Sequence, residues 1–570
     1  MGPESYILIF IAVIAGVALV AAVGQRLGIA SPLLLVAIGL TVSVLPFFPA
    51  LHVNPEWILA GVLPPLLYSS AVSVPAVEFR RDLRPISLLA VALVIVSAVL
   101  LGLFFAWVIP GLGIAMGIAL GAILSPTDAV ATSIVKRLGI SSRVTTLLEG
   151  ESLLNDATAL VLLRTAIAAV AAGFSFGAAV GAFLWSTLIA VVIGSLVGFF
   201  NLRVRAWIRH SPSHTALSFA IPFLAYFPTE ALGGSGFVAA VAAGIVTGQG
   251  AARWFTPDQR ISEELNWRTI ELVLEGSVFL LMGLELKEVF TANLQEHDGL
   301  WHGGWLALSA VGIIMAVRVI FVVILVALQA RRARGSRVRR QERLEQISTG
   351  LDERDAGPPP DRRMKIFRVR VTSALADLDY YRATPLNWRH GAIIVWAGMR
   401  GVVTLAAAQT LPEDAAQRSL LIFVAFLVAV GSLLVQGFSL PLVVRAVGLQ
   451  GTGDAGPSPE EHARLLAELR TAAARALADP RLRKPDGEPY SADFLTAMSS
   501  RLTEPPDDDT TTRVKEMRFL RLAMIDAMRT RLTELSAYGT YSTVVLRHTL
   551  AELDADQISI ELRSSDDDDL

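Results

Sequence analysis

Apolar stretches of about 20 residues recur along most of residues 6–446, and they constrain the fold more than any other feature of the sequence. A helix needs about 20 such residues to cross a bilayer core that is about 30 Å thick. A hydrophobic fraction of 53% exceeds what a soluble protein of this length requires. The sequence therefore predicts an all-α polytopic membrane protein.

We place thirteen spanning helices, with Gly or Pro at most of the joints. Their expected ranges are 6–24, 31–49, 57–74, 86–109, 112–135, 147–172, 178–202, 213–231, 235–250, 267–286, 304–329, 389–411 and 418–446. Thirteen spans divide into six, one linker helix and six, which predicts two inverted six-helix repeats. The transmembrane domain would then be 1–447, with a soluble cytoplasmic tail at 448–570.

Basic residues indicate which side of the membrane each loop faces, because cytoplasmic loops are enriched in Lys and Arg. If the N-terminus lies outside, the outside loops hold only Lys287 and Arg418. The inside loops hold Arg26, Arg80, Arg81, Arg84, Lys136, Arg137, Arg143, Arg203, Arg205, Arg209, Arg253, Arg260, Arg268 and the run from Arg331 to Arg370. This alternation predicts an outside N-terminus and a cytoplasmic C-terminus.

The charged parts of the chain are the basic cytoplasmic loop 331–388 and the tail. The basic run fits a patch for anionic membrane lipid, but a stop-transfer charge run is the preferred interpretation. In the tail, HARLLAELRTAAARALA and TRVKEMRFLRLAMIDAMRTRLTELSAY have helical apolar spacing. TEPPDDDTTT is expected to be a linker, and SSDDDDL to be disordered. The absence of Cys excludes disulfides and thiolate metal sites, and we expect neither a cofactor nor a nucleic-acid partner.

Polar residues interrupt the fifth and the twelfth spans at matching positions of the two halves. The fifth contains Pro126, which removes a helical hydrogen bond, followed by Thr127 and Asp128. The twelfth, AIIVWAGMRGVVTLAAA, contains Arg400 between two glycines. These interruptions predict a crossed pair of broken helices. Asp128 would neutralise the positive N-termini there, and Arg400 the carbonyl-rich ends, so both have structural-electrostatic roles.

The sixth span places a second acid, Asp156, inside the membrane, where a charge costs about 3 kcal/mol or more. Ser152 lies one turn before it on the same face, and Asn155 lies beside it. A hard cation such as Na⁺ prefers oxygen ligands, which Asp156, Ser152, Thr127 and freed carbonyls provide. Burial favours the protonated form of Asp156, so one carboxylate could carry either a proton or a Na⁺. That competition is enough to couple two opposite ion flows.

The alternative interpretation makes Asp156 a structural carboxylate that pairs with a buried arginine. Arg164 and Arg318 both lie in spanning segments and are the candidates. Glu275, in ELVLEGSVFLLMGLEL, is another buried acid, and structural pairing is the preferred hypothesis for it.

The segments SPTDAVA, GESLLND and WAGMRGVVTLA, in this order on spans five, six and twelve, resemble the signature segments of the monovalent cation/proton antiporters. This family includes bacterial sodium/proton antiporters and animal sodium/hydrogen exchangers. GVLPPLLYSSA in the third span and RLAMIDAMRTRLTEL in the tail are similar to their counterparts as well. The resemblance implies a Na⁺/H⁺ antiporter of the bacterial plasma membrane, and not an enzyme.

The resemblance also implies a homodimer, with a dimerisation part at about 6–74 and 213–286 and a moving core at about 86–172 and 304–446. Asp156 would carry the ion, assisted by Thr127 and Ser152, and an ion pair between Glu151 and Arg400 would hold the core together. The order Asn155-Asp156 resembles members that exchange one cation for one proton without net charge.

One position departs from the family pattern. Some relatives have Glu after the LPPLL segment, whereas this chain has Ser69 after Tyr68, which leaves the choice between Na⁺ and K⁺ open. A K⁺/H⁺ antiporter is therefore the alternative. A channel would need a symmetric filter or a ring of charges, which the sequence lacks. A remote alternative is an intramembrane aspartyl protease with Asp128 and Asp156 as the dyad.

Overall fold

The computed structural model describes residues 3–45, 54–172, 176–296, 300–335, 362–413, 415–451, 459–479, 481–484, 487–491, 493–495 and 511–568. The chain forms two compact units. The first comprises Met1–Ala251, Ser262–Ala333 and Leu386–Gly453, and the second comprises Ala252–Ile261, Arg334–Pro385 and Asp454–Leu570.

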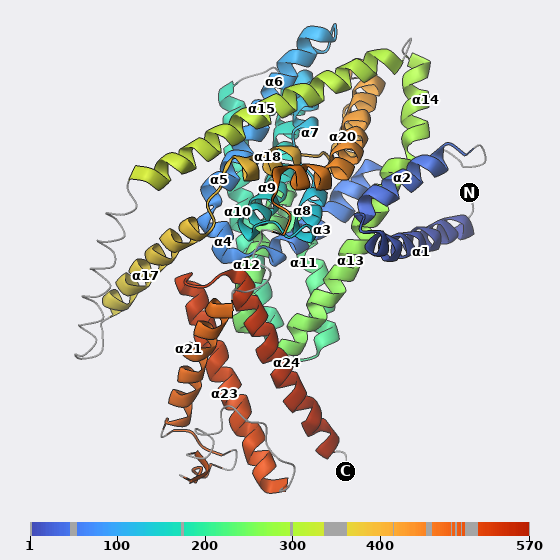
Figure 1. Ribbon diagram of the computed structural model, residues 1–570. Helices are drawn as coiled ribbons and strands as arrows, with labels where there is room; N and C mark the ends of the chain where they lie inside the picture. Colours follow the sequence, from blue (N-terminus) through green and yellow to red (C-terminus); the bar gives the residue numbers. More distant parts are fainter. Residues whose placement is uncertain are drawn as a thin grey trace. The chain divides into compact units, whose positions relative to one another are not determined.

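Helices occupy each of the thirteen ranges expected from the sequence. In chain order they are α1 (Pro3–Leu27), α2 (Ser31–Ser43), the π-helix η1 (Trp57–Val62), α3 (Leu63–Ser73), α4 (Ala76–Arg81), α5 (Leu83–Ser87), the π-helix η2 (Leu88–Ala92), α6 (Leu93–Val108), α7 (Gly113–Leu124), α8 (Val130–Arg137), α9 (Ser142–Ala172), α10 (Phe176–Arg205), α11 (Ser211–Ala231), α12 (Gly236–Trp254), α13 (Pro257–Leu284), α14 (Leu286–Glu296), α15 (Leu300–Gly335), α18 (Trp388–Trp396), α19 (Val402–Gln409) and α20 (Arg418–Val447). Figure 1 labels most of them.

Five helices in the described part of the chain are long and apolar enough to cross a membrane: Leu83–Val108, Ser142–Val170, Val180–Arg205, Trp301–Ala330 and Arg418–Val447. Four shorter apolar helices accompany them: Ile11–Gly24, Ser31–Ser43, Trp57–Ser73 and Gly113–Leu124. The all-helical membrane fold expected from the sequence is therefore present, while the number of thirteen spans stays a prediction.

Small residues let the helices of the first unit approach closely. α6 packs along α7, and a Cβ added at Gly121 of α7 would lie 2.9 Å from the backbone carbon of Ala98 in α6. α7 in turn packs against α9. Small interfacial residues are how membrane helices gain contact area without a hydrophobic driving force. This packing holds α9 beside the interrupted span formed by α7 and α8.

The fifth and the twelfth spans are each broken in the middle, as the sequence predicts. α7 ends at Leu124 and α8 begins at Val130, while α18 ends at Trp396 and α19 begins at Val402. The two breaks touch, because the backbone N–H of Asp128 donates a hydrogen bond of 2.8 Å to the carbonyl of Met399. The two interruptions are confirmed and lie in contact, and we call this contact the crossing. The arrangement of the spans in two inverted repeats stays a prediction.

The second unit contains α17 (Arg362–Ala383) and the tail helices α21 (Pro459–Leu477), α23 (Thr511–Tyr538) and α24 (Thr543–Asp568). The two stretches with helical spacing are confirmed as α21 and α23. The expectation of disorder at SSDDDDL is wrong up to Asp568, because α24 continues to that residue. The linker TEPPDDDTTT and most of the basic loop lie outside the described residues, apart from the start of α23 and α17.

Apolar side chains close the tail helices into a small core of their own. Leu465 of α21, Ile525 of α23 and Val545 of α24 belong to one buried cluster. Arg260, from the segment Ala252–Ile261 of the same unit, donates through Nε to Asp554 of α24 at 3.2 Å. The tail is therefore a packed bundle rather than an extended appendix.

Candidate ion-binding site at the crossing of the broken helices

Asp128 lies where the N-terminal ends of two half-helices meet. Its Oδ1 accepts a hydrogen bond of 3.1 Å from the backbone N–H of Val130, the first residue of α8. Gly401, which precedes α19, approaches so closely that an added Cβ would lie 2.8 Å from the Cβ of Asp128. A carboxylate is favourable beside helix N-termini because the dipoles there are positive. The structural-electrostatic role of Asp128 stays a prediction, with which this geometry agrees.

Arg400 lies at the opposite kind of helix end. Its guanidinium Nη1 donates 2.6 Å to the carbonyl of Gly398, just past the end of α18. Its backbone N–H donates 2.9 Å to the hydroxyl of Ser432 in α20. Arg400 is 3% exposed, so its charge lies inside the protein beside the carbonyl of Gly398. Its structural-electrostatic role stays a prediction.

The expected ion pair between Glu151 and Arg400 is wrong in its basic partner, which is Arg318 of α15. Arg318 donates from both terminal nitrogens to the Glu151 carboxylate, with Nη2 to Oε2 at 3.0 Å. Its Nε donates 3.0 Å to the carbonyl of Ile394 in α18. Both charged side chains are 1% exposed. Arg318 packs against the break of the twelfth span, where a Cβ added at Gly398 would lie 2.6 Å from its Nε. Arg400 instead donates to the carbonyl of Gly398.

Thr127 and Asn155 are tied to this ion pair by hydrogen bonds. The Thr127 hydroxyl donates 3.1 Å to Glu151 Oε1 and accepts from Asn155 Nδ2 at 2.6 Å. Both side chains are buried, and Asn155 Oδ1 has no hydrogen-bond partner among the described residues. The break at 125–129 is therefore fixed to α9, with one free acceptor oxygen left beside Asp156.

Asp156 has no hydrogen bond or ion pair to any residue that the structure describes. Neither basic residue considered for it is available. Arg318 binds Glu151, and Arg164 is paired with Glu230 of α11. The carboxylate of Asp128 is near enough to repel that of Asp156 electrostatically. Asp156 is thus the acid of the crossing whose charge no described side chain balances.

Ser152 is 8% exposed and lies one helical turn before Asp156 on α9. Asp156, Ser152 and the free Asn155 Oδ1 together offer hard oxygen donors, the type that suits Na⁺ or K⁺. Thr127 belongs to the same surroundings, but its hydroxyl already donates to Glu151, so only a lone pair remains for an ion.

Two acids of α13 extend the acidic character of this region. Glu275 shows no hydrogen bond or ion pair within the described residues and lies within electrostatic range of Asp128, so the structural partner expected for it is absent there. Glu271, one turn earlier on α13, lies close to Ser69, so a neighbouring helix places a carboxylate near position 69.

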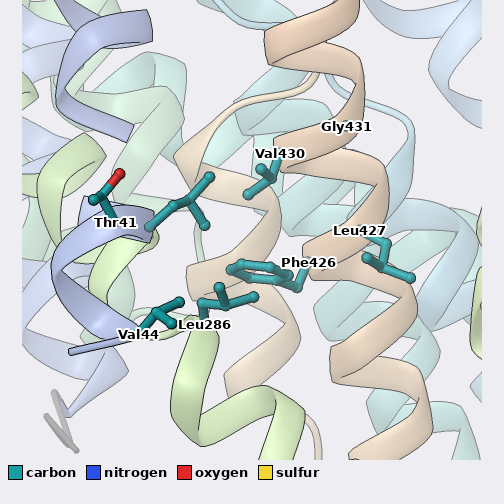
Figure 2. Close-up of a pocket in the computed structure, with 8 residues that line it drawn as sticks. Thr41, Val44, Leu286, Phe426, Leu427, Val430 and Gly431 are labelled. Atoms are coloured by element: carbon teal, nitrogen blue, oxygen red, sulfur yellow. The ribbon is translucent and has the colours of Figure 1, made fainter. Parts of the chain in front are cut away.

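A separate apolar pocket has the wrong chemistry for an ion. It lies between α2, α14 and α20 (Figure 2). Its volume is about 500 Å³. Apart from the hydroxyl of Thr41, its side chains carry no polar groups, and ions require polar ligands. Its lining residues are Leu40, Thr41, Val44, Leu286, Phe426, Leu427, Val430 and Gly431.

The chain is similar in sequence to known transporters of sodium and protons. Residues 9–446 match the family described as "Sodium/hydrogen exchanger, transmembrane". A Mycobacterium tuberculosis protein described as an uncharacterized Na⁺/H⁺ exchanger is 28% identical, covering 97% of this chain and 96% of its own. A Bacillus subtilis sodium, potassium, lithium and rubidium/H⁺ antiporter is 31% identical over 46% of this chain and 41% of its own.

Among solved structures, the sodium proton antiporter MjNhaP1 from Methanocaldococcus jannaschii is similar in fold, with a TM-score of 0.56 at 16% sequence identity. The similarity covers 79% of this chain and 100% of that one. With a family match over more than three quarters of its length, the chain belongs to the sodium/hydrogen exchanger family of multi-pass membrane proteins.

Proposed function

We propose that the protein is a secondary active antiporter that exchanges Na⁺ for H⁺ across the bacterial plasma membrane, with Asp156 as the ion-carrying group. The observation that carries the proposal is that the Asp156 carboxylate has no partner among the described residues, while Glu151 is paired with Arg318 and Asp128 accepts a hydrogen bond at a helix start. A carboxylate inside a membrane span that has no counter-charge is stabilised by binding a proton or a cation. Family membership supports cation/proton exchange as the use of that property.

In this mechanism the cation and the proton compete for one carboxylate. With a proton, Asp156 is neutral; with Na⁺, its charge is balanced by the ion, and Ser152 and Asn155 Oδ1 provide further oxygen ligands. Either loaded form is neutral and can reorient, whereas the empty, charged form cannot. One cation then moves for one proton, so the exchange is electroneutral.

The neighbouring residues keep the crossing in place during this cycle. Glu151 and Arg318 neutralise each other, and Asp128 and Arg400 neutralise the half-helix ends. Such groups need not change protonation for transport. We further propose thirteen spans in two inverted repeats, an outside N-terminus, and a homodimer that pairs through about 6–74 and 213–286, with the core at about 86–172 and 304–446 moving.

A K⁺/H⁺ antiporter on the same scaffold is the second candidate. The related Bacillus subtilis protein is named for sodium, potassium, lithium and rubidium, and Ser69 stands where some relatives have a carboxylate. An aspartyl protease is disfavoured, because Asp128 accepts a backbone hydrogen bond at a helix start and so differs from Asp156 in role.

The test is exchange by the purified protein in proteoliposomes that contain a fluorescent pH indicator. We expect external NaCl to drive proton movement that does not change when a membrane potential is imposed with valinomycin. The same measurement is repeated with KCl, in the absence of valinomycin, and with LiCl. The rates of proton movement then rank the three cations. Proton movement that no alkali cation drives would contradict the proposal, and a response to voltage would contradict electroneutral exchange.

A further inference from the structure

A small polar cavity lies beside the second broken span, between the α13–α14 turn and the loop that joins α19 to α20. Its volume is about 150 Å³, and Glu285, Glu288, Gln409, Arg418 and Ser419 contribute polar groups to its lining. All of these residues belong to the first unit. The cavity has room for one small ion with some water.

Glu285 is a buried acid that is only half satisfied. It is 3% exposed, and its Oε2 accepts 2.8 Å from the side-chain nitrogen of Gln409. Its Oε1 has no partner among the described residues, and neither has the side-chain oxygen of Gln409, although both atoms are buried. Two neighbouring acceptors without a donor are costly in a protein interior unless a water or a cation binds them.

The guanidinium of Arg418 lines the cavity but does not donate to Glu285 Oε1 or to Gln409 Oε1. Arg418 donates from Nε to the carbonyl of Leu411 at 2.9 Å and from Nη2 to the carbonyl of Gln409 at 2.7 Å. It thereby closes the loop between α19 and α20. Besides Glu285, the charged side chains that line the cavity are Glu288, which has an interaction of its own, and Arg418. The one carboxylate with an unpartnered oxygen is that of Glu285, and a single monovalent cation balances its charge.

We propose that this cavity is a second binding site for a small monovalent cation, with Glu285 Oε1 and Gln409 Oε1 as protein ligands. Oxygen donors of this kind suit Na⁺ or K⁺. Gln409 is the last residue of α19, so the negative end of that helix faces the same region. A cation bound here ties the α13–α14 turn to the second half of the broken twelfth span. The site is independent of Asp156.

The experiment measures the melting temperature of the full-length protein in detergent while NaCl or KCl replaces N-methylglucamine chloride at constant ionic strength. Asp156→Asn removes the transport carboxylate and serves as the background. We expect this variant to keep a saturable rise in melting temperature with Na⁺ or K⁺. Adding Glu285→Gln should abolish the rise, and adding Glu413→Gln, an exposed acid of the α19–α20 loop, should leave it unchanged.

If Glu285→Gln does not fold, Gln409→Met in the same background removes the second ligand, and the half-saturating cation concentration should increase about tenfold. The proposal is overturned if Asp156→Asn alone removes all saturable stabilisation, or if the stabilisation survives both substitutions. Failure of the transport proposal would look different, because Asp156→Asn would then still exchange ions whatever the melting curves show.

Discussion

At the scale of single residues, the acids at the crossing differ in their partners: Glu151 is paired with an arginine, whereas Asp156 has no partner among the described residues. Glu151 and Arg318 form a pair with two hydrogen-bonded contacts, both side chains being 1% exposed. A buried ion pair contributes little to the free energy of folding compared with apolar residues of the same size. Removal of one partner nevertheless leaves the other charge buried without a counter-charge, which is strongly destabilising. The pair therefore constrains which substitutions the core tolerates, and Asp156 is left as the group free to change its partner.

Arg318→Met should destabilise the protein by about 3–5 kcal/mol, because Glu151 would remain buried without its partner. The double variant Arg318→Met with Glu151→Gln should be less destabilised than Arg318→Met alone, because it has no unpaired buried carboxylate. Thermal unfolding in detergent measures both. Arg268→Met is the control, because its pair with Glu264 is about 70% exposed and should contribute almost nothing. Equal effects of the two arginine substitutions would refute this account.

The roles of single residues were only partly predictable. Asp128 and Arg400 could be assigned to helix ends because a motif at a helix break has a direct electrostatic consequence. The partner of Glu151 could not, because it lies 167 positions away in sequence and depends on tertiary packing. The signal for Arg318 was nevertheless present, since it is the only charged residue in the apolar run from 306 to 328. Such a charge needs a buried partner.

At the scale of elements, the two broken spans depend on how closely their backbones approach. Pro126 and the glycines around Arg400 predict the interruptions, and the structure has both at those positions. The sequence could not predict the bond between Asp128 and Met399 that joins them, because pairing of two breaks follows from the arrangement of all neighbouring helices.

Gly401→Ala should disturb this crossing, because the added methyl group would overlap the side chain of Asp128. We expect a loss of about 1–3 kcal/mol in stability, typical of overpacking, together with slower exchange. Gly431→Ala in α20 is the matched control, since nothing lies within 4 Å of its added Cβ. Melting temperature and proteoliposome exchange are the readouts. Equal melting temperatures and equal exchange rates for the two alanine variants would show that the close approach of Gly401 to Asp128 affects neither stability nor exchange.

At the scale of the whole molecule, composition and periodicity were sufficient for the class of fold but not for its topology. Long apolar runs require helices in a bilayer, since every backbone group must be satisfied within its own segment. The same runs do not reveal which of the shorter helices cross completely. Two tail helices, α21 and α23, were predictable from their apolar spacing, whereas α24 and its contact with Arg260 were not.

The absence of Cys makes the proposed orientation directly testable, since single cysteines can be introduced without background labelling. We expect Glu413→Cys, which is exposed between α19 and α20, to react with a membrane-impermeant maleimide in intact cells. Arg209→Cys, exposed between α10 and α11, should react only after permeabilisation. Labelling of both from one side would show that the alternation of basic loops does not describe the topology.

The most direct measurement is Na⁺-driven proton movement by Asp156→Asn in proteoliposomes, with its melting temperature recorded in the same preparation. The account predicts a folded protein that moves no more protons than empty liposomes, while Glu264→Gln, an exposed acid, exchanges like the unmodified chain. Exchange by Asp156→Asn at the rate of the unmodified chain would contradict the central claim that this carboxylate carries the ion.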